Sequence, residues 1–585
     1  MALGVAETTL RRTAQEEETD EQEILQNFLD KKYNDWPNEA GFVGLTEHRG
    51  PVKLQVQGTI PSYAAGALYR TGPGVGEFET AERGKYHVSH WFDGFAHTHR
   101  FDIAAAPDTP DGGAKTTVTY SSRRQGQEYI DKIKNTGWRA GITFAQRNDP
   151  CIGLFAKATS RFDKEVNNNV VVLRNVPGLE RTKTSATTPA GGHHTVTTSN
   201  ITIMTDTSTV QVLDEDTLEA VGDGTQAERF HPDLKGPLSP SHAQRDEETG
   251  DLFNVNLDFG RLATYRFFRV NAKSGTTDIL ATVSERDVSP AYIHSFFLTQ
   301  NHVVLCVPSS HIAWSGTKVL WKGNVLDAIK PFDKSALCQW IVVDRRHGKG
   351  VVARFSTPAA FFFHSVNAFE ETAADEHGQE QTYLNLDYIH FDTTATLYAM
   401  YYDVILKRNG AADAFWGDRE TVESMRPRFL RRRFALPSSA KQQKRVAAAT
   451  VAPEVLSIPS PHVGEMPTIN PAYACRPYRY VYSVPSRGLS TAVGECLAKT
   501  DLETREALIW TGPAGHTPGE AIFVARPGAD VDEDDGVVLS VVLDGEGKRS
   551  YLLCLDAKTM TEMGRAEADF PIAFGFHGLH APPAA

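Results

Sequence analysis

The 585-residue sequence predicts an all-β protein built as a β-propeller. Short runs rich in β-branched and aromatic residues recur along the chain and are separated by turn-forming residues. A weak repeat lies on top of these runs, in which a strand ends in Asp or Asn and a polar turn leads into a second strand. The clearest examples are Val212–Val221, Arg269–Ile279, Val342–Val352 and Cys554–Gly564. An array of β-sandwiches would also produce such hairpins, but no convincing linker divides the sequence, which favours the propeller.

The N-terminal part departs from the β pattern. Residues 1–24 are acidic and polar and are expected to form a flexible tail, whereas residues 25–585 are expected to form one propeller domain. A short helix is predicted near Glu23–Lys32. A second, amphipathic helix is predicted over Glu128–Lys134, because Ile130 and Ile133 recur on one side at helical spacing.

The composition excludes several classes of protein. A hydrophobic fraction of 41% and a charged fraction of 23% are ordinary for a folded protein. No apolar run reaches the ~18 residues of a membrane-spanning helix, and the first residues lack the apolar core of a secretory signal. The net charge of −13 argues against nucleic acid as a partner. The six cysteines are scattered without a CxxC pair, which favours reduced thiols in the cytoplasm and no thiolate metal site.

Four of the 20 histidines share a sequence context. Each lies beside apolar or aromatic residues, and the first three recur at intervals of about one propeller blade. They are His242, His294, His364 and His577. One inward-facing histidine from each of several blades would converge on the central axis, where four neutral imidazoles would suit iron, copper or zinc. Any one of these histidines could equally be a hydrogen-bonded core residue. The metal hypothesis therefore rests on the context that all four share.

A site built from histidines needs hydrogen-bond acceptors that orient each ring. Three carboxylates in otherwise apolar β segments are candidates for this role. They are Asp206, Glu465 and Glu520. Each of them would equally fit a turn or a helix cap.

Five motifs carry a resemblance to a known family. They are YRTGPG at Tyr69–Gly74, HWFDGFAHTHRF at His90–Phe101, LRRRFALP at Leu430–Pro437, EMPTIN at Glu465–Asn470 and the segment Gly519–Val542. With these motifs the chain resembles the carotenoid cleavage oxygenases from about Gly41 to His577. The resemblance implies a seven-bladed β-propeller with a helical and loop cap over its top face and an iron(II) ion on its axis.

The resemblance also assigns roles to single residues. It places the iron ligands on His242, His294, His364 and His577, and it places Asp206, Glu465 and Glu520 behind the last three of them in that order. The family usually has Glu where Asp206 stands, so we expect a longer or water-bridged contact there. His90 and Asp93 are expected to join neighbouring blades rather than to catalyse. The polar stretch Arg174–His194 is unusual for the family.

The implied activity is the oxidative cleavage of a conjugated C=C bond by O2, with Fe(II) as cofactor and an apolar polyene as substrate. The pattern most resembles the fungal torulene-cleaving branch, which forms an apocarotenal, and a β-carotene-cleaving, retinal-forming enzyme is the near variant. A stilbene-cleaving oxygenase is an alternative: Tyr120 matches the phenol-binding Tyr of that branch, but Lys164 does not align securely with its Lys. An isomerohydrolase or a binding propeller without chemistry is the third hypothesis.

A polyene substrate requires an apolar tunnel and access to lipid. The candidate tunnel residues are Tyr120, Phe296, Phe297, Phe361, Phe362 and Phe363. Strand alternation predicts that two of the five Phe side chains face the tunnel. The candidate patch for peripheral binding to a membrane or lipid droplet consists of Trp138, Ile142, Phe144, Cys151, Ile152, Leu154 and Phe155. The basic cluster Arg426–Arg433 would assist on anionic lipid, and no obligate protein partner is expected.

Overall fold

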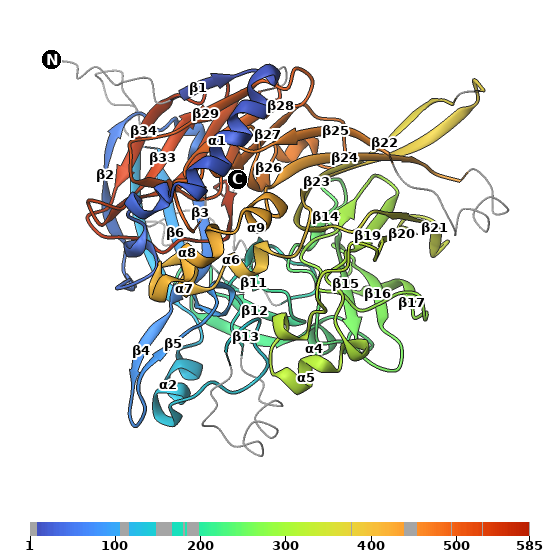
Figure 1. Ribbon diagram of the computed structural model, residues 1–585, viewed down its shortest axis with the longest axis horizontal. Helices are drawn as coiled ribbons and strands as arrows, with labels where there is room; N and C mark the ends of the chain where they lie inside the picture. The colour runs from blue at the N-terminus through green and yellow to red at the C-terminus, as the bar shows by residue number, and fades with distance from the viewer. Residues whose placement is uncertain are drawn as a thin grey trace, which may run out of the picture.

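Strands make up most of the secondary structure in the computed structural model, which confirms the all-β prediction (Figure 1). The structure describes residues 9–105, 116–147, 166–179, 182–183, 198–375, 377–437, 453–492, 494–528 and 531–583. Two short hairpins stand apart from the larger sheets. They consist of β4 (Glu77–Thr80) with β5 (Gly84–His87), and of β9 (Thr182–Lys183) with β10 (Thr198–Ser199).

Four antiparallel sheets of four strands follow one another along the described part of the chain. The first contains β8 (Val171–Arg174), β11 (Ile201–Met204), β12 (Thr209–Leu213) and β13 (Ala220–Thr225). The second contains β14 (Gln244–Arg245), β15 (Leu252–Asp258), β16 (Thr264–Val270) and β17 (Thr277–Val283). The third contains β18 (Phe297–Leu298), β19 (His302–Val307), β20 (Cys338–Asp344) and β21 (Val351–Thr357). The fourth contains β22 (Phe361–Ala374), β23 (Glu380–Phe391), β24 (Arg428–Ala435) and β25 (Glu454–Pro459).

A larger sheet joins the two ends of the chain. It contains β2 (Val52–Gly58), β3 (Gly66–Val75), β6 (Phe95–Ala104), β7 (Thr117–Arg124), β30 (His516–Pro518), β31 (Ile522–Ala525), β32 (Gly536–Asp544), β33 (Arg549–Asp556), β34 (Glu562–Glu567) and β35 (His577–Ala581). β2 pairs with both β7 and β34. β35 pairs with β3 in a register that sets His577 opposite Thr71. The position of His577 is therefore fixed by a strand from the N-terminal part of the chain.

The chain from Thr9 onward is packed and does not form the flexible tail that was expected for residues 1–24. β1 (Thr9–Arg12) pairs with β29 (Ala507–Trp510), at the edge of a sheet that also contains β26 (Glu465–Thr468), β27 (Tyr480–Val484) and β28 (Leu497–Asp501). An open sheet edge offers unpaired backbone groups, and β1 satisfies them. The following helix, α1 (Glu17–Leu29), begins earlier than the helix predicted near Glu23–Lys32. Within it, Asp20 accepts a hydrogen bond from Nε2 of buried His462 at 2.9 Å.

Helices gather in front of the sheets near the middle of the view in Figure 1. This group contains α6 (Thr396–Ala399), α7 (Tyr402–Ile405), α8 (Ala411–Trp416) and α9 (Arg419–Ser424), and α1 lies beside it. The rings of Phe28 in α1 and Trp416 in α8 are stacked with their centroids 4.2 Å apart. The other α-helices in the described part of the chain are α2 (Gln127–Thr136), where the amphipathic helix was predicted, α4 (Gln226–Arg229) and α5 (Lys318–Lys322).

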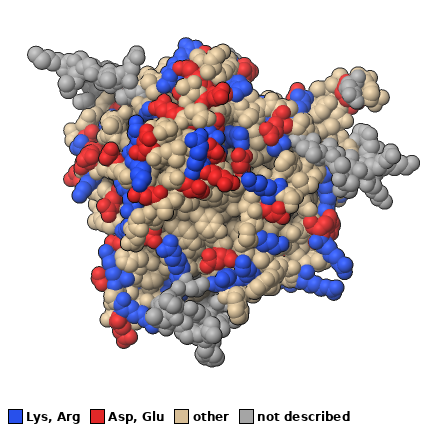
Figure 2. Space-filling view, in the orientation of Figure 1, with Lys and Arg blue, Asp and Glu red and all other residues tan. Residues whose placement is uncertain are grey.

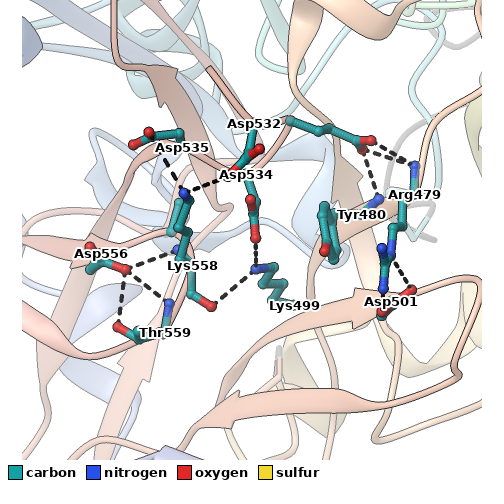
Figure 3. A network of polar contacts seen from close by, with 12 residues as sticks. Arg479, Tyr480, Lys499, Asp501, Asp532, Asp534, Asp535, Asp556, Lys558 and Thr559 are labelled. Atoms are coloured by element: carbon teal, nitrogen blue, oxygen red, sulfur yellow. Dashed lines mark hydrogen bonds and ion pairs between the residues drawn. The ribbon is translucent and has the colours of Figure 1, made fainter. Parts of the chain in front are cut away.

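A network of charged groups fastens the segment before β32 to the neighbouring sheet (Figure 3). Lys499 on β28 contacts Asp534 at 2.5 Å, and its side chain is only 6% exposed. The Glu533 carboxylate accepts hydrogen bonds from the backbone N–H groups of Arg479 at 2.9 Å and Tyr480 at 2.8 Å. A buried charge that lost its partner would destabilise the fold. These contacts therefore keep the segment before β32 in place against the sheet that contains β28.

Candidate metal centre and substrate cavity

Four histidine side chains, each carried by or next to a different sheet, converge on one point. They are His242 before β14, His294 before β18, His364 in β22 and His577 at the start of β35. One ring nitrogen from each lies within 4.8 Å of all the others. The Nε2 atoms of His242 and His294 are 3.2 Å apart, and those of His364 and His577 are 3.0 Å apart. The four residues that sequence analysis selected therefore form one cluster.

Each of three histidines donates its Nδ1 proton to a carboxylate. His294 bonds to Asp206 at 2.8 Å and His577 bonds to Glu520 at 2.7 Å. His364 bonds to Glu465 in the same way. A proton fixed on Nδ1 leaves the Nε2 lone pair free to face the centre of the cluster, which is the form of imidazole that binds a metal.

The contact between Asp206 and His294 is direct, which corrects the expected longer or water-bridged contact. Asp206 Oδ2 also accepts a hydrogen bond from the Tyr292 hydroxyl at 2.7 Å, and Oδ1 accepts one from the backbone N–H of Ser241 at 3.1 Å. The shorter side chain suffices because the segment around Ser241 packs against Asp206, with the Ser239 N–H bonded to the Asp206 carbonyl at 3.4 Å.

The cluster is buried and its electrostatics favour neutral imidazoles. Burial, followed by the three neighbouring imidazoles, lowers the pKa of His242 well below its usual value. Burial also lowers the pKa of His577, although the Glu520 carboxylate opposes this shift. Because neutral imidazole is the metal-binding form, the lowered pKa values of His242 and His577 favour the form of these two rings that binds an ion.

The donor set fits a divalent transition-metal ion. Two imidazole nitrogens at about 2.1 Å from one ion, roughly at right angles, lie about 3 Å apart, which matches the 3.0 and 3.2 Å separations found here. Imidazole suits iron, copper, zinc and nickel. Carboxylates occupy the outer positions behind the rings, where they orient the ligands.

Arg70 braces the chain that leads into His577. Its side chain is 2% exposed. Nη2 donates to the Gly575 carbonyl at 3.0 Å, and Nη1 donates to the Glu520 carbonyl at 3.2 Å. Arg70 thereby ties the backbone of Glu520 to the segment before β35. In the sequence, Arg70 could be noticed as a charged residue inside the strand motif YRTGPG. Its hydrogen-bond partners could not be predicted, because the partners of a buried cation depend on tertiary contacts.

A predominantly apolar cavity of about 170 Å³ opens onto the histidine cluster. His294, His364 and His577 form part of its wall. Seven aromatic side chains line it: Phe28, Trp91, Phe92, Phe363, Phe391, Trp416 and Phe576. Small residues of the loop after β27 line it as well, and α1, α6, α8 and α9 each contribute residues to it. The helices therefore cap the cavity, as the predicted cap over the propeller requires.

Among the candidate tunnel residues, Phe363 lines the described cavity and the other five do not. Phe296 and Phe361 pack into the large hydrophobic core that also contains Phe363. Phe297 and Phe362 point into a separate core between the third and fourth sheets. One of the five Phe side chains therefore lines the cavity, whereas two were expected to. Alternation explains why Phe362 points away from the side of Phe363, because neighbouring residues of a strand face opposite sides.

Tyr120 lies away from the cavity in the first part of the large sheet. Its hydroxyl contacts His99 Nδ1 at 2.8 Å, and the side chain is 1% exposed. Lys164, its proposed companion in the stilbene hypothesis, lies outside the described residues. The expected phenol-binding role of Tyr120 therefore has no support from its position.

The cavity residues that sequence analysis missed come largely from the helices and from the HWFDGF motif. Trp91 and Phe92 belong to that motif, and the residues around them fix their backbone. Asp93 accepts hydrogen bonds from the N–H groups of Phe144 at 2.8 Å and Ala145 at 2.6 Å. His90 Nε2 donates to the Leu397 carbonyl at 2.8 Å. His90 and Asp93 thus fasten this motif to α6 and to the segment at Phe144 and Ala145, while their expected role in joining neighbouring blades stays a prediction.

The seven candidate lipid-binding residues do not form one surface patch among the described residues. Phe144 packs against the core and its ring lies 4.9 Å from that of Phe92, so it does not belong to a surface patch. Ile142 is 38% exposed and Trp138 is partly exposed. The other four candidates, Cys151, Ile152, Leu154 and Phe155, lie outside the described residues, as does most of the stretch Arg174–His194.

The basic cluster Arg426–Arg433 is paired with carboxylates, contrary to the expectation that it would meet anionic lipid. Arg431 contacts Asp387 at 2.7 Å, and Arg428 contacts Asp392 at 2.5 Å. Arg426, Arg432 and Arg433 contact Glu21, Glu454 and Glu371 in that order. Basic and acidic side chains likewise alternate over the upper part of the face in Figure 2. Strand pairing sets Asp387 opposite Arg431 and Glu454 opposite Arg432. The other acids come from α1, from β22 and from the residue after β23, and the pairs leave little free positive charge.

Comparison with known proteins agrees with this geometry. Residues 42–582 match the family described as retinal pigment epithelial membrane protein. The chain is 52% identical over 577 residues to a torulene dioxygenase of Gibberella fujikuroi, with 98% of each chain covered. It is 50% identical to a carotenoid dioxygenase of Neurospora crassa, covering 98% of this chain and 96% of that one.

Solved structures show the same fold. A variant of the Synechocystis apocarotenoid oxygenase aligns with a TM-score of 0.68 at 20% identity, covering 95% of this chain and 99% of that chain. The cobalt-substituted form of that oxygenase aligns with a TM-score of 0.65 at 22% identity, covering 94% and 99%. The chain therefore belongs to the retinal pigment epithelial membrane protein family, the carotenoid oxygenases that its motifs resemble.

Proposed function

We propose that this protein is an iron(II)-dependent dioxygenase that cleaves a conjugated C=C bond of a carotenoid, foremost torulene, with O2 to give apocarotenal products. The observation that carries the proposal is the four-histidine cluster that opens into an apolar, aromatic-lined cavity. The 52% identity to a torulene dioxygenase over nearly the whole chain supports the choice of substrate.

In this proposal His242, His294, His364 and His577 hold the iron, and Asp206, Glu465 and Glu520 keep three of the rings in place. The bound iron would supply the activation of O2. The protein supplies the rest: the aromatic wall binds the flat polyene by apolar contact, and the buried site excludes water. These four neutral ligands would hold the ion without surrounding it with protein charge, and the ion would supply the chemistry with O2.

The cavity favours a hydrocarbon chain over a polar substrate. The charged side chains among its described lining, the histidines apart, are Arg426 and Glu465, and Glu465 is bonded to His364. A polyene that fills the cavity would stack on Trp91, Phe92 and Phe363 and bury a large apolar area. Retinal-forming cleavage of β-carotene is the near variant of this function, because the same wall would accept that hydrocarbon.

Aerobic turnover of the Fe(II)-loaded protein in detergent tests the proposal. Torulene, β-carotene and resveratrol are offered separately, and the products are identified by chromatography and mass. We expect an apocarotenal from torulene. Retinal from β-carotene alone would make the retinal-forming variant the function, and aldehydes from resveratrol alone would move the protein to the stilbene branch. No product from any of them, with iron shown to be bound, would overturn the oxygenase function in favour of an isomerohydrolase or a binding propeller.

Among the described helices, none combines the length and the apolar character needed to cross a membrane. We infer that the protein meets a membrane or lipid droplet peripherally, through apolar side chains on and beside α5. Trp314, Leu320 and Trp321 are 60%, 43% and 65% exposed. The Thr143 N–H donates to the Gly323 carbonyl at 3.1 Å, which keeps exposed Ile142 next to α5. Exposed tryptophans beside lysines are typical of lipid-binding surfaces.

Sedimentation with phosphatidylcholine vesicles tests this surface. We expect the double variant Trp314→Ser, Trp321→Ser to bind several-fold less than the wild type, while the variant Arg431→Gln, outside the α5 surface, binds as the wild type does after its folding is verified. Equal binding by the wild type and the double variant would remove the α5 surface from the proposal.

A further inference from the structure

Glu495 is a buried carboxylate that the proposed chemistry does not use. It lies directly before β28, in the loop that follows β27, and is 1% exposed. Burial raises the pKa of its carboxyl to about 7, although hydrogen bonds from backbone N–H groups lower it. Burying a carboxyl group costs solvation free energy, so we infer that Glu495 has a role in the fold or in the site.

The Glu495 carboxylate gathers the N–H groups of one loop. Oε1 accepts hydrogen bonds from Leu489 at 3.1 Å and Ser490 at 2.6 Å, and also from the Ser486 hydroxyl at 3.4 Å. Oε2 accepts one from Arg487. All of these partners are donors. The conformation of the loop therefore requires two acceptor oxygens close together, and an ionised carboxylate provides them.

The same loop forms one wall of the substrate cavity. The residues that it contributes are Ser486, Ser490, Thr491, Ala492 and Gly494. These side chains are small, whereas the aromatic residues Trp91, Phe92 and Phe363 form other parts of the wall. Because these side chains are small, the space available to a polyene on this side of the cavity is set by the position of the loop backbone.

Further contacts brace this loop against the helical cap. Asn27 in α1 donates from Nδ2 to the Arg487 carbonyl at 2.8 Å, and the Thr491 hydroxyl donates to the Ile405 carbonyl in α7 at 2.5 Å. A Cβ atom at Gly488 would lie 2.7 Å from the Ile24 carbonyl, so the loop approaches α1 closely. On its other side the loop follows β27, which pairs with the strand that carries Glu465. The loop thus spans from the cap to a carboxylate behind His364.

We propose that Glu495 is a positioning residue for substrate specificity: it fixes the small-residue wall of the cavity and thereby determines which C=C bond of the polyene lies at the four-histidine centre. The inference rests on the proposed carotenoid cleavage and deepens it. Glu495 itself touches neither substrate nor metal in this role. It acts through the Ser486 hydroxyl and the Ser490 backbone N–H, which it binds directly. The Ser490 hydroxyl in turn accepts a hydrogen bond from the backbone N–H of Ala492 at 3.2 Å.

The variant Glu495→Gln tests the proposal. Glutamine keeps the size of the side chain but replaces one acceptor oxygen by an NH2 donor, so at least one of the loop N–H groups loses its partner. We expect the fraction of product cleaved at neighbouring double bonds to rise about tenfold, since a shift of one bond needs only a small change in transition-state energy. Product masses from torulene give this ratio, and KM is expected to rise with it.

The control is Glu533→Gln, which alters a carboxylate that also accepts two backbone N–H bonds but lies outside the cavity lining. It is expected to keep the wild-type product. Loss of folded protein lowers the yield of every product equally, so a changed product ratio cannot come from partial unfolding. A single wild-type product and an unchanged KM in Glu495→Gln would overturn the role of Glu495.

A second variant covers the case in which Glu495→Gln does not fold. Ala492→Leu adds bulk to the same wall without removing a hydrogen bond, and it is expected to shift the cleaved bond or to raise KM several-fold. Wild-type products and KM in this variant would overturn the proposed wall. Absence of carotenoid cleavage by the wild type itself would instead overturn the proposed function, and the role of Glu495 with it.

Discussion

The Nε2 atoms of His364 and His577 lie 3.0 Å apart although 213 positions separate the two residues in the chain. His364 is carried by β22, whereas His577 begins β35 and is held by pairing with β3. The cluster is therefore complete only when the C-terminal strand has joined the N-terminal part of the chain. An ion held by all four histidines would therefore couple its binding to closure of the fold.

Replacing Asp206 by Asn is expected to weaken iron binding about 10- to 100-fold, as loss of a carboxylate behind a ligand typically does. Asp206 receives hydrogen bonds from His294, Tyr292 and Ser241. Asn has one acceptor oxygen and cannot satisfy all three donors. Iron per chain after dialysis against a graded chelator measures the effect. Asp206→Glu, which keeps the carboxylate, should retain more iron than Asp206→Asn; equal iron in the wild type and Asp206→Asn would contradict the assigned role.

Tyr120→Phe is expected to leave carotenoid cleavage unchanged and to cost about 1 kcal/mol of unfolding free energy, because His99 loses a buried hydrogen-bond partner. Phe92→Ala, by contrast, removes an aromatic ring from the cavity wall and is expected to raise KM for the polyene. Steady-state kinetics and urea unfolding of the two variants distinguish the positions. A large loss of activity in Tyr120→Phe would place this residue in the substrate site after all.

Lys499→Met is expected to destabilise the fold by about 3–5 kcal/mol, since it leaves the Asp534 carboxylate buried without its partner (Figure 3). The Lys499 and Asp534 side chains are only 6% and 12% exposed. The double variant Lys499→Met, Asp534→Asn removes both charges and should recover part of the loss. Urea unfolding of both variants measures the difference, and a cost below about 1 kcal/mol for the single variant would show that the pair is solvated.

Glu370 makes the stability of the fold depend on acid pH. Burial by itself would raise the pKa of Glu370, but hydrogen bonds from His302, Thr299 and Asn301 outweigh it and lower the pKa to about 2. A lowered carboxyl pKa stabilises the folded state fully above the ordinary value of 4.5, and this contribution is lost as the pH falls from 4.5 towards 2.

We therefore expect the unfolding free energy of the wild type to fall more steeply between pH 5 and 3 than that of Glu370→Gln, by up to about 2 kcal/mol after allowance for partial solvation. Urea unfolding at a series of pH values gives both slopes. The exposed Glu503→Gln serves as the control and should keep the wild-type slope. Identical slopes in the wild type and Glu370→Gln would mean that this carboxyl titrates normally.

The sequence alone predicted the all-β fold and the residues that form the histidine cluster. His242, His294 and His364 could be found because an imidazole in an apolar β segment is unusual and recurred at blade-like intervals, while His577 was found by its apolar context. Their carboxylate partners could be proposed because Asp206, Glu465 and Glu520 are charged groups in apolar surroundings. These signals are local, since the cost of burying a polar group acts on each residue separately.

The tertiary structure alone decided which residues face the substrate cavity and which charges are neutralised. Phe363 lines the cavity while Phe362, its neighbour in β22, packs between two sheets. The arginines of β24 face carboxylates from other segments, and Thr9–Arg12 completes the edge of a sheet near the C-terminal end of the chain. Which side chains face the cavity, which charges form pairs and which strand completes a sheet edge all depend on contacts between segments far apart in the chain. Local composition and periodicity do not encode such relations, because packing settles them only when the whole chain has folded.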